Sequence, residues 1–340
     1  VLENAASATV SVIRYGVTNI AGTVNYATSD GTATNGVDYV GVTNTLTFLP
    51  GVTNTNFTVA ISDNQAVQLN RFLNLSLASA TPTNIASVGT NGVATLTIVD
   101  NDNTFSFSAS GYTVNEAAGS LSVAVLRFGQ NTGLVSVAYS TVPLAIVSAA
   151  AATADYTVSA ATLFFGAGQS NLSFTVPIVA DLLPEGDEQF GLFLSNPLPA
   201  GATQLGLTNT ATANIVDDDI GIGFSTNAYT VAESAGTATI TVLRAGVTNV
   251  SVSAAFATTN GSALAGTDYI ATNAVFVFAA GVTSRTFTVP IVNDSVSESP
   301  ETVNLRLSNP TGGAFLTISN AVLTIVDNVG SVGFTATNFL

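Results

Sequence analysis

Carboxylates are the residues of this chain that could do chemistry. The chain has 21 Asp and Glu against six basic residues, all of them Arg, and its formal net charge is −15. It has no Cys, His, Met or Trp. Zinc, haem, iron–sulfur and copper sites therefore lose their usual ligands, and Cys–His or Ser–His nucleophiles and lysine Schiff bases are excluded. The acidic balance also argues against a nucleic-acid partner, which needs a basic surface.

Nearly all of these carboxylates recur at equivalent turns and strand ends in three successive repeats. The first repeat holds Glu3, Asp38, Asp63, Asp100 and Asp102. The second holds Glu116, Asp155, Asp181, Glu185, Glu188, Asp217, Asp218 and Asp219. The third holds Glu233, Asp268, Asp294, Glu298, Glu301 and Asp327. Only Asp30 and Asp187 fall outside this pattern.

Carboxylates gathered at one end of a domain repel one another strongly unless a cation lies between them. Many hard oxygen ligands in flexible loops suit Ca²⁺, which takes six to eight oxygens, better than Mg²⁺. The pattern therefore predicts calcium sites. The alternative is that acidic turns only keep a secreted protein soluble. In the first repeat, Val67 and Asn70 replace the two Glu of the other repeats. We therefore expect affinity to fall from the second repeat to the third and to be weakest in the first.

The segments that must position these carboxylates are β-strands. Residues 9–13 and 93–98 alternate apolar and polar side chains with period two and are rich in Thr and Val, as half-buried strands are. Roughly seven short strands in about 110 residues is typical of an immunoglobulin-like sandwich. The predicted fold is all-β: three tandem antiparallel sandwiches, here called unit 1 (residues 1–103), unit 2 (104–219) and unit 3 (220–329), with residues 330–340 as a linking strand.

The combined motifs resemble the Calx-beta family over the whole chain. The motifs are Val-x-Glu, Gly-x-Asp-Tyr, Val-Pro-Ile, Asp-x3-Glu-x2-Glu, Leu-Ser-Asn-Pro and Ile-Val-Asp-Asp-Asp. The resemblance implies a sandwich with calcium held by loops at one end. Its ligands carry over most completely to unit 2. In unit 3, Asn328 and Val329 replace two of the closing acids, and unit 1 departs most.

The two ends of the chain match each other. Units 2 and 3 begin with a strand before their Glu, Phe107 to Tyr112 in unit 2, whereas unit 1 starts at Val1 without one. Residues 332–340 have the same pattern, with Phe334 and Phe339 in the places of Phe107 and Tyr112. We therefore expect the C-terminal strand to complete the first sandwich of a neighbouring copy. The predicted polymer interface is Phe334, Ala336, Phe339, Leu340 and Val1.

Three origins of this match stay open. The tail strand could insert into the next subunit, the chain could be one period of a longer tandem polypeptide, or the match could come from an arbitrarily cut fragment. No apolar run approaches the roughly 20 residues of a membrane-spanning helix, and no signal peptide is seen. Arg14, Arg127 and Arg244 share one repeat position, where we expect a structural role rather than anion binding.

The sequence thus favours an extracellular structural protein: the repeating unit of a head-to-tail bacterial surface filament, stiffened by Ca²⁺. One alternative is a stalk or binding module of a calcium-dependent adhesin, and another is a calcium-sensing regulatory region. An enzyme is not expected. Paired carboxylates can run glycoside hydrolysis, but an active site repeated three times in equivalent loops is improbable.

Overall fold

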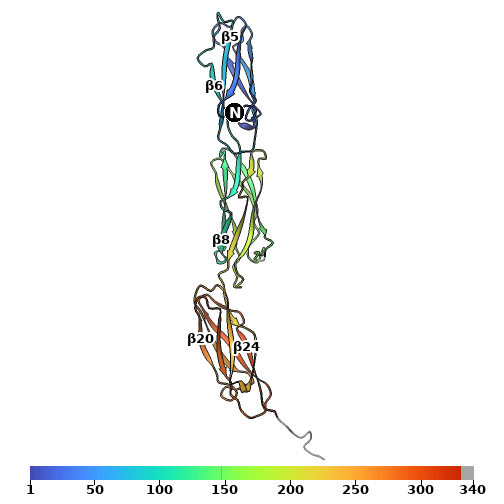
Figure 1. Cartoon of the computed structure of the whole chain (residues 1–340), viewed down its shortest axis with the longest axis vertical. Coiled ribbons are helices and arrows are strands. Elements are labelled where there is room, and N and C mark those ends of the chain that lie inside the picture. Colours follow the sequence, from blue (N-terminus) through green and yellow to red (C-terminus); the bar gives the residue numbers. More distant parts are fainter. Residues whose placement is uncertain (147, 331–340) are drawn as a thin grey trace, which may run out of the picture.

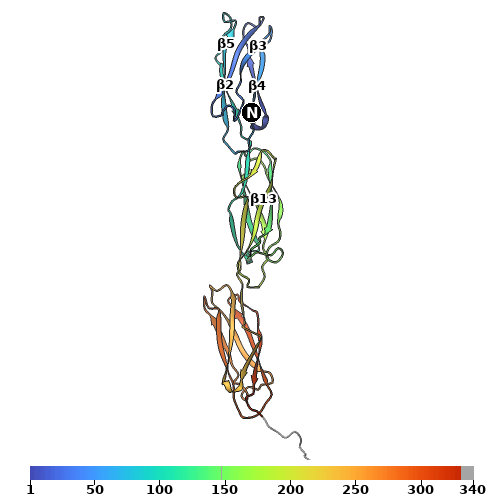
Figure 2. The same cartoon turned by 45° about the vertical axis from the view of Figure 1, so that its right-hand side comes forward.

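The computed structural model of the chain describes residues 1–146 and 148–330. Three β-sandwiches lie in a line and make an elongated rod, with unit 1 at one end and unit 3 at the other (Figure 1; Figure 2). The predicted all-β fold is confirmed. The predicted linking strand, with Phe334, Ala336, Phe339 and Leu340, lies outside the described residues. No helix in the described part of the chain is long and apolar enough to cross a membrane.

Unit 2 is a sandwich of a five-stranded and a four-stranded sheet. The first sheet has the order β11 (Ala160–Phe165), β10 (Val135–Pro143), β13 (Glu188–Leu198), β15 (Thr210–Val216), β8 (Gly111–Asn115). The second has the order β12 (Asn171–Pro177), β9 (Ser120–Gly129), β7 (Asn103–Phe107), β14 (Thr203–Leu205). Alternate residues of both sheets point inward, so Val123, Val125 and Leu194 are fully buried between them.

Unit 3 repeats this topology strand for strand. Its five-stranded sheet has the order β17 (Ala228–Ala232), β24 (Asn320–Val326), β22 (Glu301–Thr311), β19 (Val252–Asn260), β20 (Asn273–Phe278). Its other sheet has the order β21 (Ser284–Pro290), β18 (Thr237–Gly246), β16 (Ile220–Phe224), β23 (Phe315–Leu316).

The segment before each Glu is not the single strand that the sequence suggested. In unit 2 it divides into β7 and β8, which pair in opposite sheets, β7 with β9 and β8 with β15. Phe107 ends β7 and Tyr112 lies in β8, with the ring centroids 6.5 Å apart. Ser108 to Ser110 cross between the sheets. The alternating pattern does not mark this crossing, because both strands bury alternate residues in one shared core.

Unit 1 is smaller. One sheet has the order β3 (Thr43–Phe48), β2 (Gly22–Asp30), β5 (Arg71–Thr81), β6 (Val93–Ile98), and the other is β1 (Ser7–Ile13) paired with β4 (Asn54–Ala60). A parallel bridge from Leu2 to Val99 stands in the place of β8. No counterpart of β7 is present among the described residues. The sheet that contains β1 therefore has two strands, whereas its counterparts in units 2 and 3 have four.

Arg127 and Arg244 are 4% exposed and have the structural role expected for them. The Arg127 guanidinium donates to the carbonyl oxygens of Gly133 and Gly166, and that of Arg244 to the carbonyl of Val250. Burial lowers the pKa of both guanidinium groups. In both units these bonds hold the loop that follows the arginine's strand, and in unit 2 they also reach the residue after β11.

The units join without a linker. β7 begins at the residue after Asp102, and β16 begins at the residue after Asp219. At the second junction a Cβ on Gly246 would lie 2.1 Å from the Asp219 carbonyl oxygen and 2.8 Å from Pro184 Cβ, and the glycine has φ +76°. Gly129 repeats the arrangement beside Asp102 and Val67. A glycine of each later unit thus packs closely against a loop of the unit before it.

Gly246→Ala should lower the melting temperature of the chain more than Gly281→Ala does, because only Gly246 lies at the junction. Gly281 also has a positive φ, +79°, but nothing lies within 4 Å of its Cβ position. The control therefore carries only the backbone strain of about 1–2 kcal/mol, whereas Gly246→Ala adds a steric overlap of roughly 1–3 kcal/mol. Thermal melts and small-angle X-ray scattering of the full chain would test this. Equal melting temperatures and equal scattering curves would contradict it.

Candidate metal centres

The predicted carboxylates gather at one end of each sandwich. A 3₁₀ turn carries the first Glu of each unit: η1 (Glu3–Ala5), η2 (Glu116–Ala118) and η3 (Glu233–Ala235). The others come from the Asp-Tyr turn, the loop after β4, β12 or β21, the first residue of β13 or β22, and the residues that follow β6, β15 or β24. In units 1 and 2 this end is the one that continues directly into the next unit.

Each Asp-Tyr turn is anchored by its buried tyrosine. Tyr39, Tyr156 and Tyr269 are 1% exposed or less. Tyr39 donates to Asp30 Oδ1 at 2.7 Å, and Tyr269 donates to Asn260 Oδ1 at 2.8 Å. Burial and the Asp30 bond raise the pKa of Tyr39 to about 12. Asp30, which the repeat pattern left unassigned, is therefore the hydrogen-bond acceptor of the buried Tyr39 hydroxyl.

Unit 2 forms two separate triads of carboxylates. We call Glu116, Asp217 and Asp219 the strand-end triad, and Asp155, Glu185 and Glu188 the loop triad. In each triad one carboxylate oxygen per residue lies within 4.8 Å of the other two. The sequence predicted one pool of ligands, but the sandwich divides them because they come from different strand ends.

Backbone amides fix the strand-end triad. Asp217 accepts from the amide of Asp219 at 3.0 Å and from that of Gly186 at 3.1 Å. Glu116 Oε1 accepts from the amide of Asp181 at 2.8 Å. Asp181 itself accepts from the amide of Leu183 and lies outside both triads. These bonds hold the loop that carries Glu185 against the end of β15.

Burial and neighbouring carboxylates raise the pKa of several acids in unit 2. Burial raises the pKa of Glu188 to about 7, and its bond to Asp155 adds to the shift. Burial and neighbouring acids also raise the pKa of Glu116, Glu185 and Asp219. The site therefore favours either protons or a cation between its carboxylates.

Unit 3 keeps the loop triad, formed by Asp268, Glu298 and Glu301. Burial raises the pKa of Glu301 to about 7. Its strand-end set is incomplete, because Val329 stands at the position of Asp219. The amides of Glu298 and Val329 donate to Asp327 and lower its pKa.

Unit 1 keeps the other triad, formed by Glu3, Asp100 and Asp102. All three residues are at most 2% exposed. Neither carboxylate oxygen of Asp102 has a hydrogen-bond partner, and burial raises the pKa of this group to about 7. Unit 1 therefore retains a candidate cation site at the junction with unit 2.

The loop triad of unit 1 is replaced by an arginine. Arg71 pairs with Ile98 across β5 and β6, as Glu188 pairs with Ile215 and Glu301 with Ile325. The prediction that Asn70 replaces this Glu was wrong by one residue, because the loop from Asp63 is one residue longer in unit 1. Asn70 instead accepts from the amide of Asp100.

Arg71 makes ion pairs where the other units gather acids. Its Nη1 lies 2.6 Å from Asp38 Oδ1, and its Nη2 lies 3.7 Å from Glu3 Oε1. Both carboxylates are 2% exposed and Arg71 is 19% exposed. The guanidinium thus supplies positive charge beside two acids whose counterparts in unit 2 form no ion pair among the described residues. Sequence comparison alone missed it, because the inserted residue shifts the alignment.

Several predicted ligands lie outside the triads. The exposed Asp63 and Asp218 are among them, and Asp218 accepts only a 3.4 Å bond from the amide of Ala117. Asp294 accepts from the amide of Val296. The buried Glu233 accepts from the amide of Asp294 through Oε1, whereas its Oε2 has no partner. Asp187, also unassigned by the repeats, lines a cavity between Pro184 and Val247 at the second junction.

Fold and site together define an immunoglobulin-like β-sandwich with carboxylate groups gathered at one end, repeated three times. The Calx-beta domain model matches residues 1–102, 100–219 and 217–329. The chain therefore belongs to the Calx-beta family. The triads of units 1 and 2 fit Ca²⁺ chemically, because their donors are all carboxylate oxygens. Both oxygens of Asp102 in unit 1 and Oδ2 of Asp219 in unit 2 are also buried without hydrogen-bond partners.

Curated relatives include extracellular and membrane proteins. The chain is 29% identical over 322 residues to adhesion G-protein coupled receptor V1 of Danio rerio, covering 88% of the chain. It is 28% identical over 199 residues to the sodium/calcium exchanger Calx of Drosophila melanogaster, covering 58% of the chain. It is 33% identical over 176 residues to extracellular matrix protein 3 of Lytechinus variegatus, covering 49% of the chain. The matched regions span only 5%, 20% and 6% of these relatives.

Among solved structures, the apo-form Calx CBD1 domain is 32% identical and covers 32% of this chain and 97% of its own, with a TM-score of 0.32. The two-domain CBD12 from CALX1.2 is 22% identical and covers 65% of this chain and 99% of its own, with a TM-score of 0.35.

Without metal, the chain should become less stable as pH rises from about 5 to 8. The folded-state pKa values of Glu188 and Glu301 lie near 7, above the usual 4.5, so the folded chain holds protons that the unfolded chain has released. Saturating Ca²⁺ should remove this loss, because the ion stabilises the ionised carboxylates. Thermal melts in chelator and in Ca²⁺ at several pH values test this. A chelated chain equally stable at pH 5 and pH 8 would contradict it.

Arg71→Gln should destabilise unit 1 by roughly 3 kcal/mol, because it leaves buried carboxylates without a cation. Ca²⁺ should recover part of that loss. Arg306→Gln is the matched control, since Arg306 is exposed on a strand of unit 3. Denaturant unfolding of the full chain with each substitution, with and without Ca²⁺, measures both effects. Equal midpoints for the two variants would show that the ion pair is dispensable.

Proposed function

We propose that this chain is a calcium-stiffened extracellular structural element that joins head to tail with further copies as a surface filament. The observation that carries the proposal is the position of the carboxylate triads. In units 1 and 2 they lie where one sandwich runs into the next without a linker. A cation held there would restrict the angle between two units as well as stabilise the unit that binds it.

One loop of unit 2 would transmit this effect, because it both supplies a carboxylate to the triad and contacts the next unit. Glu185 belongs to the loop triad, and the adjacent Pro184 packs against Gly246 of unit 3. At the first junction, Val67 packs against Gly129, and Gln130 Nε2 donates to Asn70 Oδ1 at 3.2 Å. Ordering the ligand loop therefore orders the surface on which the next unit rests.

An extracellular location is supported by the relatives named for adhesion and for the extracellular matrix. The proposal includes no catalytic step, because equivalent triads recur in different units rather than forming one distinctive site. A calcium-sensing region is the second candidate, favoured by the match to the exchanger Calx. The linkerless junctions support a mechanical role more directly.

Ca²⁺ should make the rod measurably stiffer. We expect the scattering-derived maximum dimension to have a narrower distribution in Ca²⁺ than in chelator, and Glu188→Gln to lose much of this difference. Asp30→Asn is the control: it also removes one carboxylate, but Asn260 already does the same work for Tyr269 in unit 3. Calorimetric titration of the same variants measures the binding itself. A rod whose scattering ignores Ca²⁺ would refute stiffening, and a chain that stays monomeric in Ca²⁺ by electron microscopy and ultracentrifugation would refute the filament.

A further inference from the structure

The two junctions of the rod have the same backbone plan but are held by different side chains. In each, a glycine of the later unit, Gly129 or Gly246, packs against the ligand loop of the unit before it. The ligand loop is the segment 62–70 between β4 and β5 in unit 1, and the segment 179–187 between β12 and β13 in unit 2. The side chains of this loop decide how firmly the junction is held.

Amide side chains replace the acids in the ligand loop of unit 1. Arg71 and Glu188 hold the same position at the start of β5 and β13. Counted back from them, Asn64, Gln68 and Asn70 stand at the positions of Asp181, Glu185 and Asp187. In both loops the first of these residues accepts a bond from the amide two residues later, at 2.8 Å in unit 1 and 2.6 Å in unit 2. Each acid of this loop in unit 2 is therefore an amide of the same length in unit 1.

The amides bind the unit 1 loop to its own sandwich. An amide side chain donates as well as accepts, whereas an ionised carboxylate only accepts. Asn64 donates through Nδ2 to Glu3, and Gln68 donates through Nε2 to Asn64 Oδ1 at 3.0 Å. Asn70 Oδ1 accepts from the amide of Asp100 at 3.2 Å. Neutral side chains therefore hold this loop in place without a cation.

One of these amides also bonds across the first junction. Gln130 Nε2 of unit 2 donates to Asn70 Oδ1 of unit 1 at 3.2 Å. The same two positions at the second junction are Val247, which also follows the junction glycine, and Asp187, which also precedes the long strand. A valine side chain has no donor, so this bond is lost. Asp187 and Val247 instead line an open cavity of about 400 Å³.

The charges of the loop triads differ in the same direction. The strand-end triads do not separate the two junctions, since units 1 and 2 each have one. The loop triad of unit 2 consists of three acids. Its positions in unit 1 carry an acid, an amide and a guanidinium, whose formal charges cancel: Asp38, Gln68 and Arg71. Without a cation, like charges push the unit 2 loop outward, whereas the unit 1 loop is free of this repulsion.

We propose that the junction between units 2 and 3 is a hinge whose stiffness depends on bound Ca²⁺, whereas the chain's own side chains fix the junction between units 1 and 2. This rests on the calcium stiffening proposed above and assigns it to one junction. With Ca²⁺ the rod is stiff along its whole length. Without Ca²⁺ it bends at one place, where Pro184 packs against Gly246.

Distances between spin labels measure each junction separately, and the chain has no Cys of its own. Thr58, Thr175 and Thr288 are exposed at equivalent positions of β4, β12 and β21. Labels on the Thr58→Cys, Thr175→Cys pair span the first junction, and labels on the Thr175→Cys, Thr288→Cys pair span the second. In pulsed electron paramagnetic resonance, chelator should widen the second distance distribution about twofold through the repulsion in the unit 2 loop. The first distribution should keep its width.

Exchanging the loop side chains tests the cause. Glu185→Gln with Glu188→Arg gives unit 2 the triad of unit 1, and the second junction should then keep its narrow distribution in chelator. Glu298→Gln with Glu301→Arg is the matched control. It makes the same change at the far end of unit 3 (Figure 1), so the response of the second junction to chelator should persist.

The outcomes separate this proposal from the stiffening on which it rests. Equal widening at both junctions, or widening at the first alone, would overturn the assignment of the hinge and leave calcium stiffening in place. Unchanged widths at both junctions would refute the stiffening itself, and with it the hinge. The two label pairs in the otherwise unchanged chain decide between these outcomes even where a loop variant fails to fold.

Discussion

Electrostatic repulsion at the end of each sandwich is the constraint on which the rest of this structure depends. Three or more carboxylates lie within a few ångströms of one another where the chain leaves a unit, and several of them are buried. Unbalanced, they would oppose folding. The three units differ in how they meet this constraint. Unit 2 keeps two complete triads, unit 3 ends one set with Val329 in place of an acid, and unit 1 places Arg71 between Asp38 and Glu3.

The same constraint connects the local site with the shape of the rod. The first Asp of each closing run, Asp100 or Asp217, accepts amides from the ligand loop and from the residue two places later, which begins the passage into the next unit. Hydrogen bonds to one carboxylate thus connect the loop, the strand end and the residue before the following strand. A cation bound beside it would lie next to the surface that Gly129 or Gly246 contacts.

The fold, and the turns and strand ends where the acidic residues gather, could be predicted from the sequence, because both depend on patterns that repeat. Period-two alternation gave the strands, and the Asp-Tyr and Ile-Val-Asp motifs gave the ends where acids gather. Arg71 could not be placed in this way. Its role depends on its pairing with Ile98, and one inserted residue hides that pairing from a linear comparison. The division into two triads was hidden too, because it depends on which strand ends meet in space. Asp30 looked unassigned because its partner Tyr39 is nine residues away and buried.

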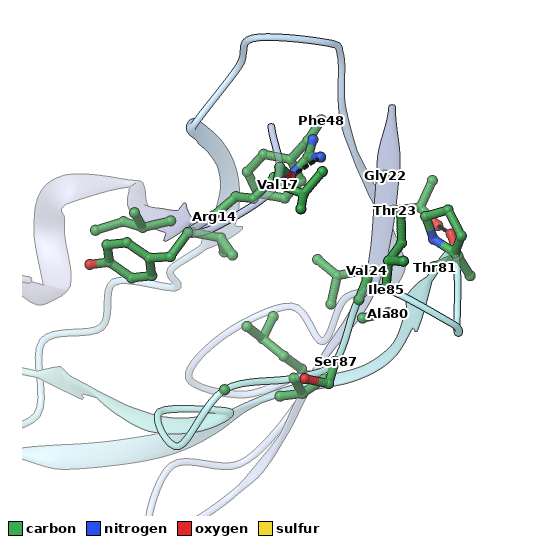
Figure 3. Close-up of a pocket in the computed structure, with 18 of the residues that line it drawn as sticks. Arg14, Val17, Gly22, Thr23, Val24, Phe48, Ala80, Thr81, Ile85 and Ser87 are labelled. Carbon is green, nitrogen blue, oxygen red and sulfur yellow. Dashed lines mark hydrogen bonds between the residues drawn. The ribbon is translucent and has the colours of Figure 1, made fainter. Parts of the chain in front are cut away.

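Unit 1 differs from its neighbours on the face where a preceding unit would dock. Gly129 and Gly246 each approach a loop of the unit before them, whereas Gly16, with φ +84°, has nothing within 4 Å of its Cβ position. Gly16 lies just beyond β1, between Tyr15 and Val17, which line an open groove of unit 1 (Figure 3). In units 2 and 3 the first strand lies next to the loop that this glycine contacts, since the strand begins at the residue after the last acid of the preceding unit. The close approach of this glycine and the start of the next unit's first strand are therefore one structural feature, present at both junctions.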